Sequence, residues 1–320
     1  MTRTIIRSRK DLNRALSSYM DNIEKCKRKW GPIEMWNVSA VTDMSRLFYS
    51  KKFRQFNGDI SGWDVSNVTT MERMFFFKIE FNQPIGKWDV SKVINMHKMF
   101  YAAAVFNQPV GDWNVSSVTT MEKMFNCASE FNQPIEQWKL SSSIGNMNRI
   151  FYGASSFNQP IGYWDVSSVV NMTRMFRSAY KFNKNINNWD VSKVTHMEKM
   201  FVGAIEYNQP IDRWICKMEN VTDKDHIFRG AFRFHQPIQY VLEESSKIDS
   251  NNVFGTYAPF EIEDFYTTLS YFIFLEFLGG WSSSVDDSHL TKEEQWIEID
   301  PLCCKIFQFI YYNYTNVGFS

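Results

Sequence analysis

The sequence predicts an α/β repeat solenoid with a helical cap at each end. The first observation is a set of tryptophans that recur every 25 to 27 residues: Trp36, Trp63, Trp88, Trp113, Trp138, Trp164, Trp189 and Trp214. The second is that the flanking residues repeat as well, from Phe81-Asn82-Gln83-Pro84 to the next copy at Phe106-Asn107-Gln108-Pro109. A unit of about 25 residues has too small an interior to fold alone, so its copies must stack to bury their apolar sides.

The N-terminal residues 1–31 predict a helical cap. Ser8 and Asp11 have the spacing of a capping box, and Leu12, Leu16 and later apolar residues fall on one helix face. Gly31 is placed to end the helix. We expect this helix to cover the open edge of the first repeat, where backbone groups and apolar side chains would otherwise meet water.

Each unit of the array, residues 32–240, predicts one short strand followed by one short helix. Trp88 and Val90 alternate with polar residues, which favours a strand over Trp-Asp-Val-Ser. Val68, Met71, Met74 and Phe75 have helical spacing. With parallel strands about 4.8 Å apart, we expect the strands to line a concave face and the helices a convex face.

The remaining residues, 241–320, lose the period and are rich in aromatic residues. Capping-box and proline signals predict a mainly helical cap or appended domain. The apolar run from Phe265 to Gly279 contains Glu276 and is shorter than the 18 or so residues that a membrane span requires, which favours a buried helix.

The repeated Phe-Asn-Gln-Pro-Ile, Trp-Asp-Val-Ser and Met-x-x-Met-Phe motifs resemble the BspA-like leucine-rich-repeat proteins. Their unit of roughly 25 residues also occurs in mycoplasma surface lipoproteins, and similar arrays occur in protists and their large DNA viruses. The resemblance covers about residues 32–238. It implies a right-handed leucine-rich-repeat-like coil that binds a macromolecule without catalysis, and it brings no shared catalytic residues.

Composition narrows the functional classes. The chain has 35 basic and 35 acidic residues, so no net field attracts it to nucleic acid or membrane. The five cysteines lack metal-ligand spacing and indicate buried thiols in a reducing compartment. The N-terminus lacks the pattern of a signal peptide or lipoprotein signal, which predicts an intracellular or virion-associated protein. No catalytic, cofactor or metal motif is present, and we expect a non-enzyme without cofactors.

Two sets of side chains on the expected concave face are candidates for partner binding. The residue before each tryptophan varies while its neighbours do not: Lys87, Asp112, Gln137, Tyr163, Asn188 and Arg213. The residue after it is usually acidic or an amide: Asp64, Asp89, Asn114, Asp165 and Asp190. The alternative for the residues before the tryptophans is that they are only solvated. The alternative for the residues after the tryptophans is that they accept hydrogen bonds from backbone N–H groups in the adjoining turn.

Two further ladders are weaker candidates. The first is a row of cations on the expected convex helices: Arg46, Arg73, Lys98, Lys123, Arg149, Arg174 and Lys199. Such cations suit a helix C-terminus and pair with nearby glutamates, whereas a basic stripe for nucleic acid is disfavoured by the interleaved acids. The second is an asparagine ladder, which we expect to satisfy backbone groups between coils, as the paired methionines fill the core.

The sequence therefore predicts a non-enzymatic scaffold that binds a protein through its concave face. The alternative is a structural component of a larger assembly, such as a virion or cortical layer, docked through residues 241–320. The identity of the partner and the oligomeric state stay open at this point.

Overall fold

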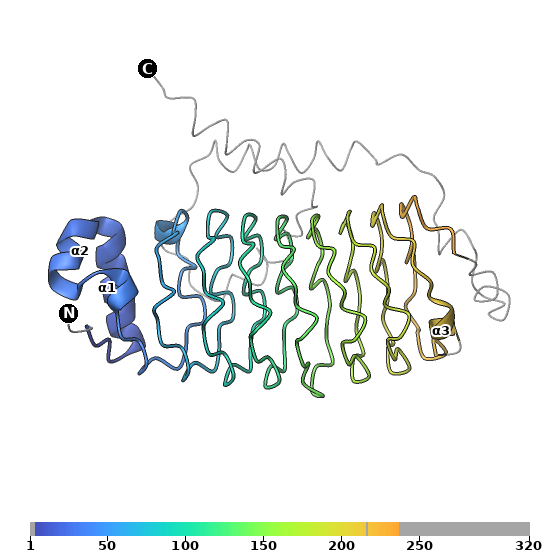
Figure 1. The fold of residues 1–320 in the computed structure, drawn as a ribbon, viewed down its shortest axis with the longest axis horizontal. Helices are drawn as coiled ribbons and strands as arrows, with labels where there is room; N and C mark the ends of the chain where they lie inside the picture. Colours follow the sequence, from blue (N-terminus) through green and yellow to red (C-terminus); the bar gives the residue numbers. More distant parts are fainter. Residues whose placement is uncertain (1–3, 216, 237–320) are drawn as a thin grey trace, which may run out of the picture. The chain divides into compact units, whose positions relative to one another are not determined.

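The computed structural model describes residues 4–215 and 217–236. In Figure 1 the described chain runs from two N-terminal helices into a series of coils stacked side by side. The predictions for residues 241–320, including the buried helix, the C-terminal cap and the docking segment, lie outside the described residues.

Two helices form the N-terminal segment. Helix α1 (Arg9–Asp21) begins at Ser8, whose Oγ accepts a hydrogen bond from the Asp11 N–H at 3.1 Å, so the predicted cap is confirmed. The single expected helix is interrupted at Asn22, which is extended and caps helix α2 (Ile23–Trp30) through its side chain. Gly31 then ends α2 with a φ of 70°, as predicted.

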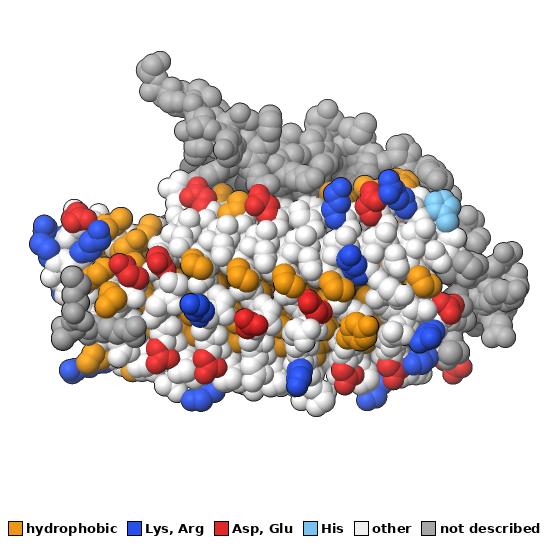
Figure 2. Space-filling view, in the orientation of Figure 1, with side chains coloured by type: hydrophobic (Ala, Val, Ile, Leu, Met, Phe, Trp, Pro, Cys, Tyr) orange, Lys and Arg blue, Asp and Glu red, His pale blue; other side chains and the backbone are white. Residues whose placement is uncertain are grey.

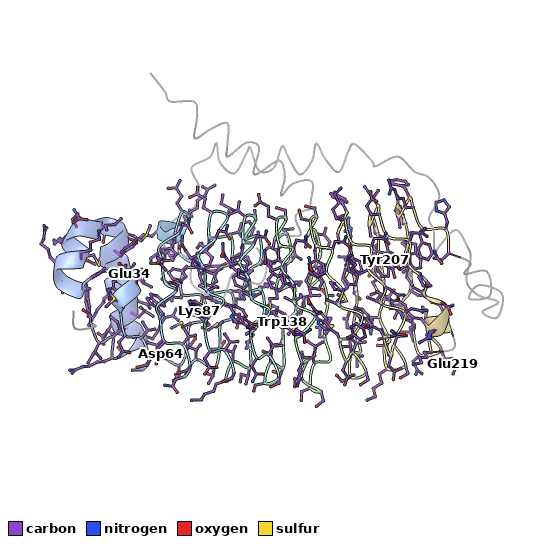
Figure 3. The ribbon with its side chains drawn as sticks, viewed as in Figure 1. Glu34, Asp64, Lys87, Trp138, Tyr207 and Glu219 are labelled. Atoms are coloured by element: carbon purple, nitrogen blue, oxygen red, sulfur yellow. The ribbon has the colours of Figure 1, made fainter. Side chains whose placement is uncertain are left out.

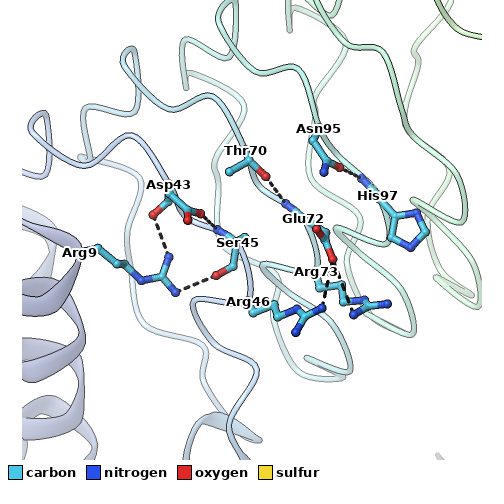
Figure 4. A network of polar contacts seen from close by, with 9 residues as sticks. All are labelled: Arg9, Asp43, Ser45, Arg46, Thr70, Glu72, Arg73, Asn95 and His97. Carbon is cyan, nitrogen blue, oxygen red and sulfur yellow. Dashed lines mark hydrogen bonds and ion pairs between the residues drawn. The ribbon is translucent and has the colours of Figure 1, made fainter. Parts of the chain in front are cut away.

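Helix α1 packs on the first coil. Leu12, Ala15 and Leu16 are buried in the common core. The Arg9 guanidinium donates to the carbonyl oxygens of Asp43 and Ser45, both at 2.8 Å (Figure 4). These bonds satisfy carbonyl groups at the edge of the stack, where no earlier coil can supply a donor.

Over the described residues the coils consist mainly of turns, and the helix and strand expected in each unit do not form there. The other helical segments are short: η1 (Ile33–Met35), η2 (Lys51–Phe53) and α3 (Asp212–Ile215). In the segment predicted as a helix, the Met74 N–H donates to the Met71 carbonyl at 3.1 Å, which closes a single turn. Arg73 has a φ of 52°, and a right-handed helix cannot continue through a left-handed residue.

The coils are joined along these turns, not along the Trp-Asp-Val-Ser segment. The N–H groups of Met71, Arg73 and Phe75 donate to the carbonyls one coil further on, each at 2.9 Å, while intervening groups close turns. Parallel bridges join Asp43 through Thr70 and Asn95 to Thr120. We call this side of the stack the hydrogen-bonded side. The prediction therefore placed the inter-coil pairing in the wrong part of the unit.

The bridges resume at Asn146 and run through Asn171 and His196 to Asp223. Among the described residues, no bridge joins Thr120 to Asn146. That coil contains the additional residue in Ser141-Ser142-Ser143, which shifts the local register. The ladder is regained within two residues, because Lys123 N–H donates to the Asn148 carbonyl at 3.0 Å.

The core consists of columns of equivalent side chains. Phe75 lies 5.4 Å from Phe100 in the next coil and 4.0 Å from Phe81 in its own, measured between ring centroids. Trp88 is buried, and its indole N–H donates to the Ile60 carbonyl of the preceding coil at 3.2 Å. The paired methionines are fully buried, so their predicted role as core fillers is confirmed.

Gly86 lies where two coils approach each other closely. A Cβ added there would meet the Pro109 carbonyl oxygen at 2.0 Å, whereas one added at Gly145 would meet nothing within 4 Å. We expect Gly86→Ala to lower the free energy of unfolding by about 1–3 kcal/mol, because backbone must move to relieve the overlap. Urea unfolding followed by tryptophan fluorescence measures this, with Gly145→Ala as the matched control. Equal midpoints for the two variants would contradict the close approach.

Candidate functional site

The residues before each tryptophan form one exposed row, with one side chain from each of six consecutive coils. We call it the recognition row: Lys87, Asp112, Gln137, Tyr163, Asn188 and Arg213. The tryptophan that follows each of them points into the core, which directs the row outward. Tyr163 is 87% exposed, far more than expected for a large aromatic side chain.

The face that carries the recognition row is chemically mixed. Figure 3 labels Lys87 and Asp64 on the face seen in Figure 2, where acidic, basic and apolar side chains are interspersed. A surface without one dominant charge fits recognition of a specific protein better than capture of a polyanion. The side chain of Arg213 donates to the Asn188 side-chain oxygen at 2.6 Å, so neighbouring members of the row also orient one another.

The residues after each tryptophan form the acceptors of short turns. Asp64, Asp89, Asn114, Asp165 and Asp190 each accept the N–H of the serine two positions on, at 3.0 to 3.2 Å. The predicted backbone hydrogen bonding is confirmed. The serine hydroxyl and N–H lower the pKa of Asp89, Asp165 and Asp190, because both donors stabilise the carboxylate.

The distances between equivalent aromatic rings of neighbouring coils do not support the predicted concave face on the tryptophan side. Trp36–Trp63, Trp138–Trp164 and Trp189–Trp214 are 6.1 to 6.3 Å apart between centroids. The phenylalanines of the same coils toward the hydrogen-bonded side are Phe48–Phe75, Phe151–Phe176 and Phe201–Phe228, and they are 5.4 to 5.8 Å apart. A concave face requires the closer spacing, and the closer spacing lies on the side of the bridges.

The cation ladder lies in turns on the hydrogen-bonded side, so the expected position at helix C-termini was wrong. Every member has a φ between 52° and 57°: Arg46, Arg73, Lys98, Lys123, Arg149, Arg174 and Lys199. The position is the third residue of a turn that needs a positive φ, which glycine or asparagine would occupy more easily. The sequence contained no signal for this conformation, since no coil has a glycine there.

Glutamates interleave with the cation ladder, as the alternative to a nucleic-acid stripe predicts. Glu72 lies 3.6 Å from Arg46 and 3.7 Å from Arg73 between charged atoms (Figure 4). Glu122 pairs with Lys123 at 3.2 Å, and Glu198 pairs with Arg174 at 3.6 Å. The ladder is therefore an ion-pair network rather than a uniformly positive stripe.

The asparagine ladder has the predicted structural role. The Asn132 side-chain oxygen accepts the backbone N–H of Asn158 at 2.9 Å and the amide of Gln159 at 2.8 Å. Equivalent bonds run along the stack from Asn57 to His235. Since each amide oxygen satisfies a backbone donor of the next coil, the ladder holds the coils in register.

The described residues contain few groups suited to catalysis or metal binding. Burial lowers the pKa of His97 to about 4, and its Nδ1 lies 3.9 Å from the carboxylate of Glu122. Cys26 and Cys127 are buried free thiols, and burial raises the pKa of Cys26. Over the described ranges, no three His, Cys, Asp or Glu side chains are grouped as metal ligands. None of the described helices has the length and apolar character needed to cross a bilayer.

Stacked coils with an ordered interior and one variable exposed row define the class of repeat proteins. The chain belongs to the family described as "Mycoplasma protein of unknown function, DUF285", whose model matches residues 14–138 and 127–241. Comparison with curated proteins and with solved structures found no match.

Proposed function

We propose that this chain is a non-enzymatic scaffold of the BspA-like leucine-rich-repeat type, a right-handed solenoid that binds a protein partner through the recognition row. The observation that carries the proposal is the contrast within each coil. The tryptophan at each position is buried and bonded to the preceding coil, whereas the residue before it is exposed and different in every coil. Side chains that do not pack in the core can vary from coil to coil, and a repeat protein varies its binding surface at such positions.

The chemistry of the recognition row supports a protein ligand. It combines one large exposed aromatic, two amides and charges of both signs. Tyrosine provides rigid contact area and a hydroxyl, and amide side chains adapt to polar partners, which is the composition of many protein-binding surfaces. The acidic residues after the tryptophans add a polar rim, since Asp64, Asp89 and Asp165 are exposed.

Affinity capture with the full chain tests this function. We expect the wild-type chain to retain a protein from an extract of its source, with cross-links that map to Lys87. The triple reversal Lys87→Glu, Asp112→Lys and Arg213→Glu should lose that protein. A control with reversals at two exposed residues away from the row, Lys25→Asp and Asp225→Arg, should keep it. Retention of the same protein by the row variant would overturn the proposed surface.

A further inference from the structure

Five of the six residues of the recognition row are centred on Tyr163, and Lys87 lies one coil beyond them. One coil away on either side stand amides, Gln137 and Asn188. Two coils away stand opposite charges, Asp112 on one side and Arg213 on the other. Read outward from Tyr163, the row is therefore amide then acid in one direction, and amide then base in the other.

We propose that the recognition row binds the same row of a second copy of this chain, antiparallel and related by a two-fold axis through Tyr163. This inference deepens the proposed function and rests on it, because it names the partner of the same surface. A two-fold axis places each residue opposite its counterpart at equal distance from the centre. Asp112 of each copy then faces Arg213 of the other, which forms two ion pairs.

The central residues fit this arrangement as well. Gln137 of one copy faces Asn188 of the other, and amides can both donate and accept across the pair. The two Tyr163 rings meet at the axis, where stacking of exposed aromatics removes apolar surface from water. An aromatic anchor at the centre surrounded by polar contacts is the usual distribution of binding energy in a protein interface.

The side chains that must form the ion pairs are accessible. Asp112 and Arg213 are both exposed, and Tyr163 is 87% exposed. Arg213 donates to the Asn188 side-chain oxygen at 2.6 Å and is itself exposed, and a planar guanidinium binds a carboxylate through two parallel N–H groups.

The charge pattern also selects the antiparallel orientation. A parallel alignment in register would place Asp112 on Asp112 and Arg213 on Arg213, and like charges directly opposed destabilise an interface. The five positions are separated by four coil-to-coil steps, which span roughly 19 Å at ordinary strand spacing. A single row of this length buries less surface area than a standard dimer interface, so we expect weak association that depends on concentration.

Sedimentation equilibrium of the full chain over a range of concentrations tests the proposal. The wild-type chain should self-associate reversibly to a dimer. Asp112→Arg and Arg213→Asp should each weaken the dimer at least about 10-fold, the loss expected when opposed charges become alike. Tyr163→Ser should also weaken it.

Charge exchange gives the decisive comparison. In an equimolar mixture of the Asp112→Arg chain with the Arg213→Asp chain, both pairs are again complementary, so a heterodimer should form more tightly than either variant self-associates. The double variant Asp112→Arg with Arg213→Asp should regain self-association. The remote reversals Lys25→Asp and Asp225→Arg should leave the wild-type dimer unchanged.

Two results would overturn the proposal. One is a chain that stays monomeric at every concentration, and the other is a dimer that the single reversals do not weaken. Either result leaves the proposed function standing if the row variant still loses a distinct protein in affinity capture. Failure of the proposed function would instead appear as identical capture by the wild-type chain and the row variant.

Discussion

Replacing Phe131 by alanine is expected to lower the free energy of unfolding by about 3–5 kcal/mol, the range for large aromatics deleted from a core. Phe131 is fully buried. Its ring lies 3.9 Å from that of Phe125 in its own coil, 6.2 Å from Phe106 and 6.1 Å from Phe157 in the adjacent coils. The substitution therefore opens a cavity in the middle of a continuous column, where neither neighbour can move inward without breaking its own stacking.

Thermal and urea unfolding followed by tryptophan fluorescence will measure this loss. Tyr163→Ala is the matched control, because it removes an aromatic ring of similar size that is 87% exposed, and we expect its stability to change by less than about 0.5 kcal/mol. Similar losses for both variants would show that the phenylalanine column does not carry the stability of the array.

Replacing Lys78 by methionine is expected to stabilise the protein by up to about 3 kcal/mol at pH 7. The Lys78 side chain is only 2% exposed, and its ammonium donates to the Phe76 carbonyl at 3.2 Å. Burial, followed by the charge of Arg54, lowers the pKa of Lys78 from 10.5 to about 8. A shift of this size corresponds to about 3 kcal/mol of penalty on the charged form.

The sign of the pH dependence follows from the lowered pKa. Between about pH 8 and 10.5 the unfolded chain binds a proton at Lys78 that the folded chain has released, so the stability contribution of Lys78 rises with pH. The penalty is fully present below pH 8. The gain from Lys78→Met should therefore be largest at pH 7 and fall below about 1 kcal/mol at pH 10.

Denaturation midpoints at the two pH values measure this effect, with Lys181→Met as an exposed control. A gain that is equal at pH 7 and pH 10 would indicate that methionine acts by packing alone. The burial of Lys78 has a trace in the sequence, because later coils have Ala103, Ala128 and equivalent alanines at this position, all buried.

The local conformation of the Met-x-x-Met-Phe segment could not be read from its pattern. Residues three apart share a face both in a helix and in successive turns closed by i to i+3 hydrogen bonds. Met71 and Met74 have this spacing in either structure. The turns are selected because Met71, Arg73 and Phe75 then direct their N–H groups to the next coil, which a helix would bond internally.

The sequence by itself determined the repeat length, the buried residues of each coil, the asparagine ladder, the N-terminal helix cap and the row of variable residues. The helix cap follows from the capping pattern at Ser8, and the other features follow from periodicity, which one chain displays in eight copies. Only the tertiary structure decided where the coils bond to one another and which residues have a positive φ. Those features depend on contacts between side chains or backbone groups about 25 residues apart, and a pattern within one coil cannot distinguish the partners that stacking supplies.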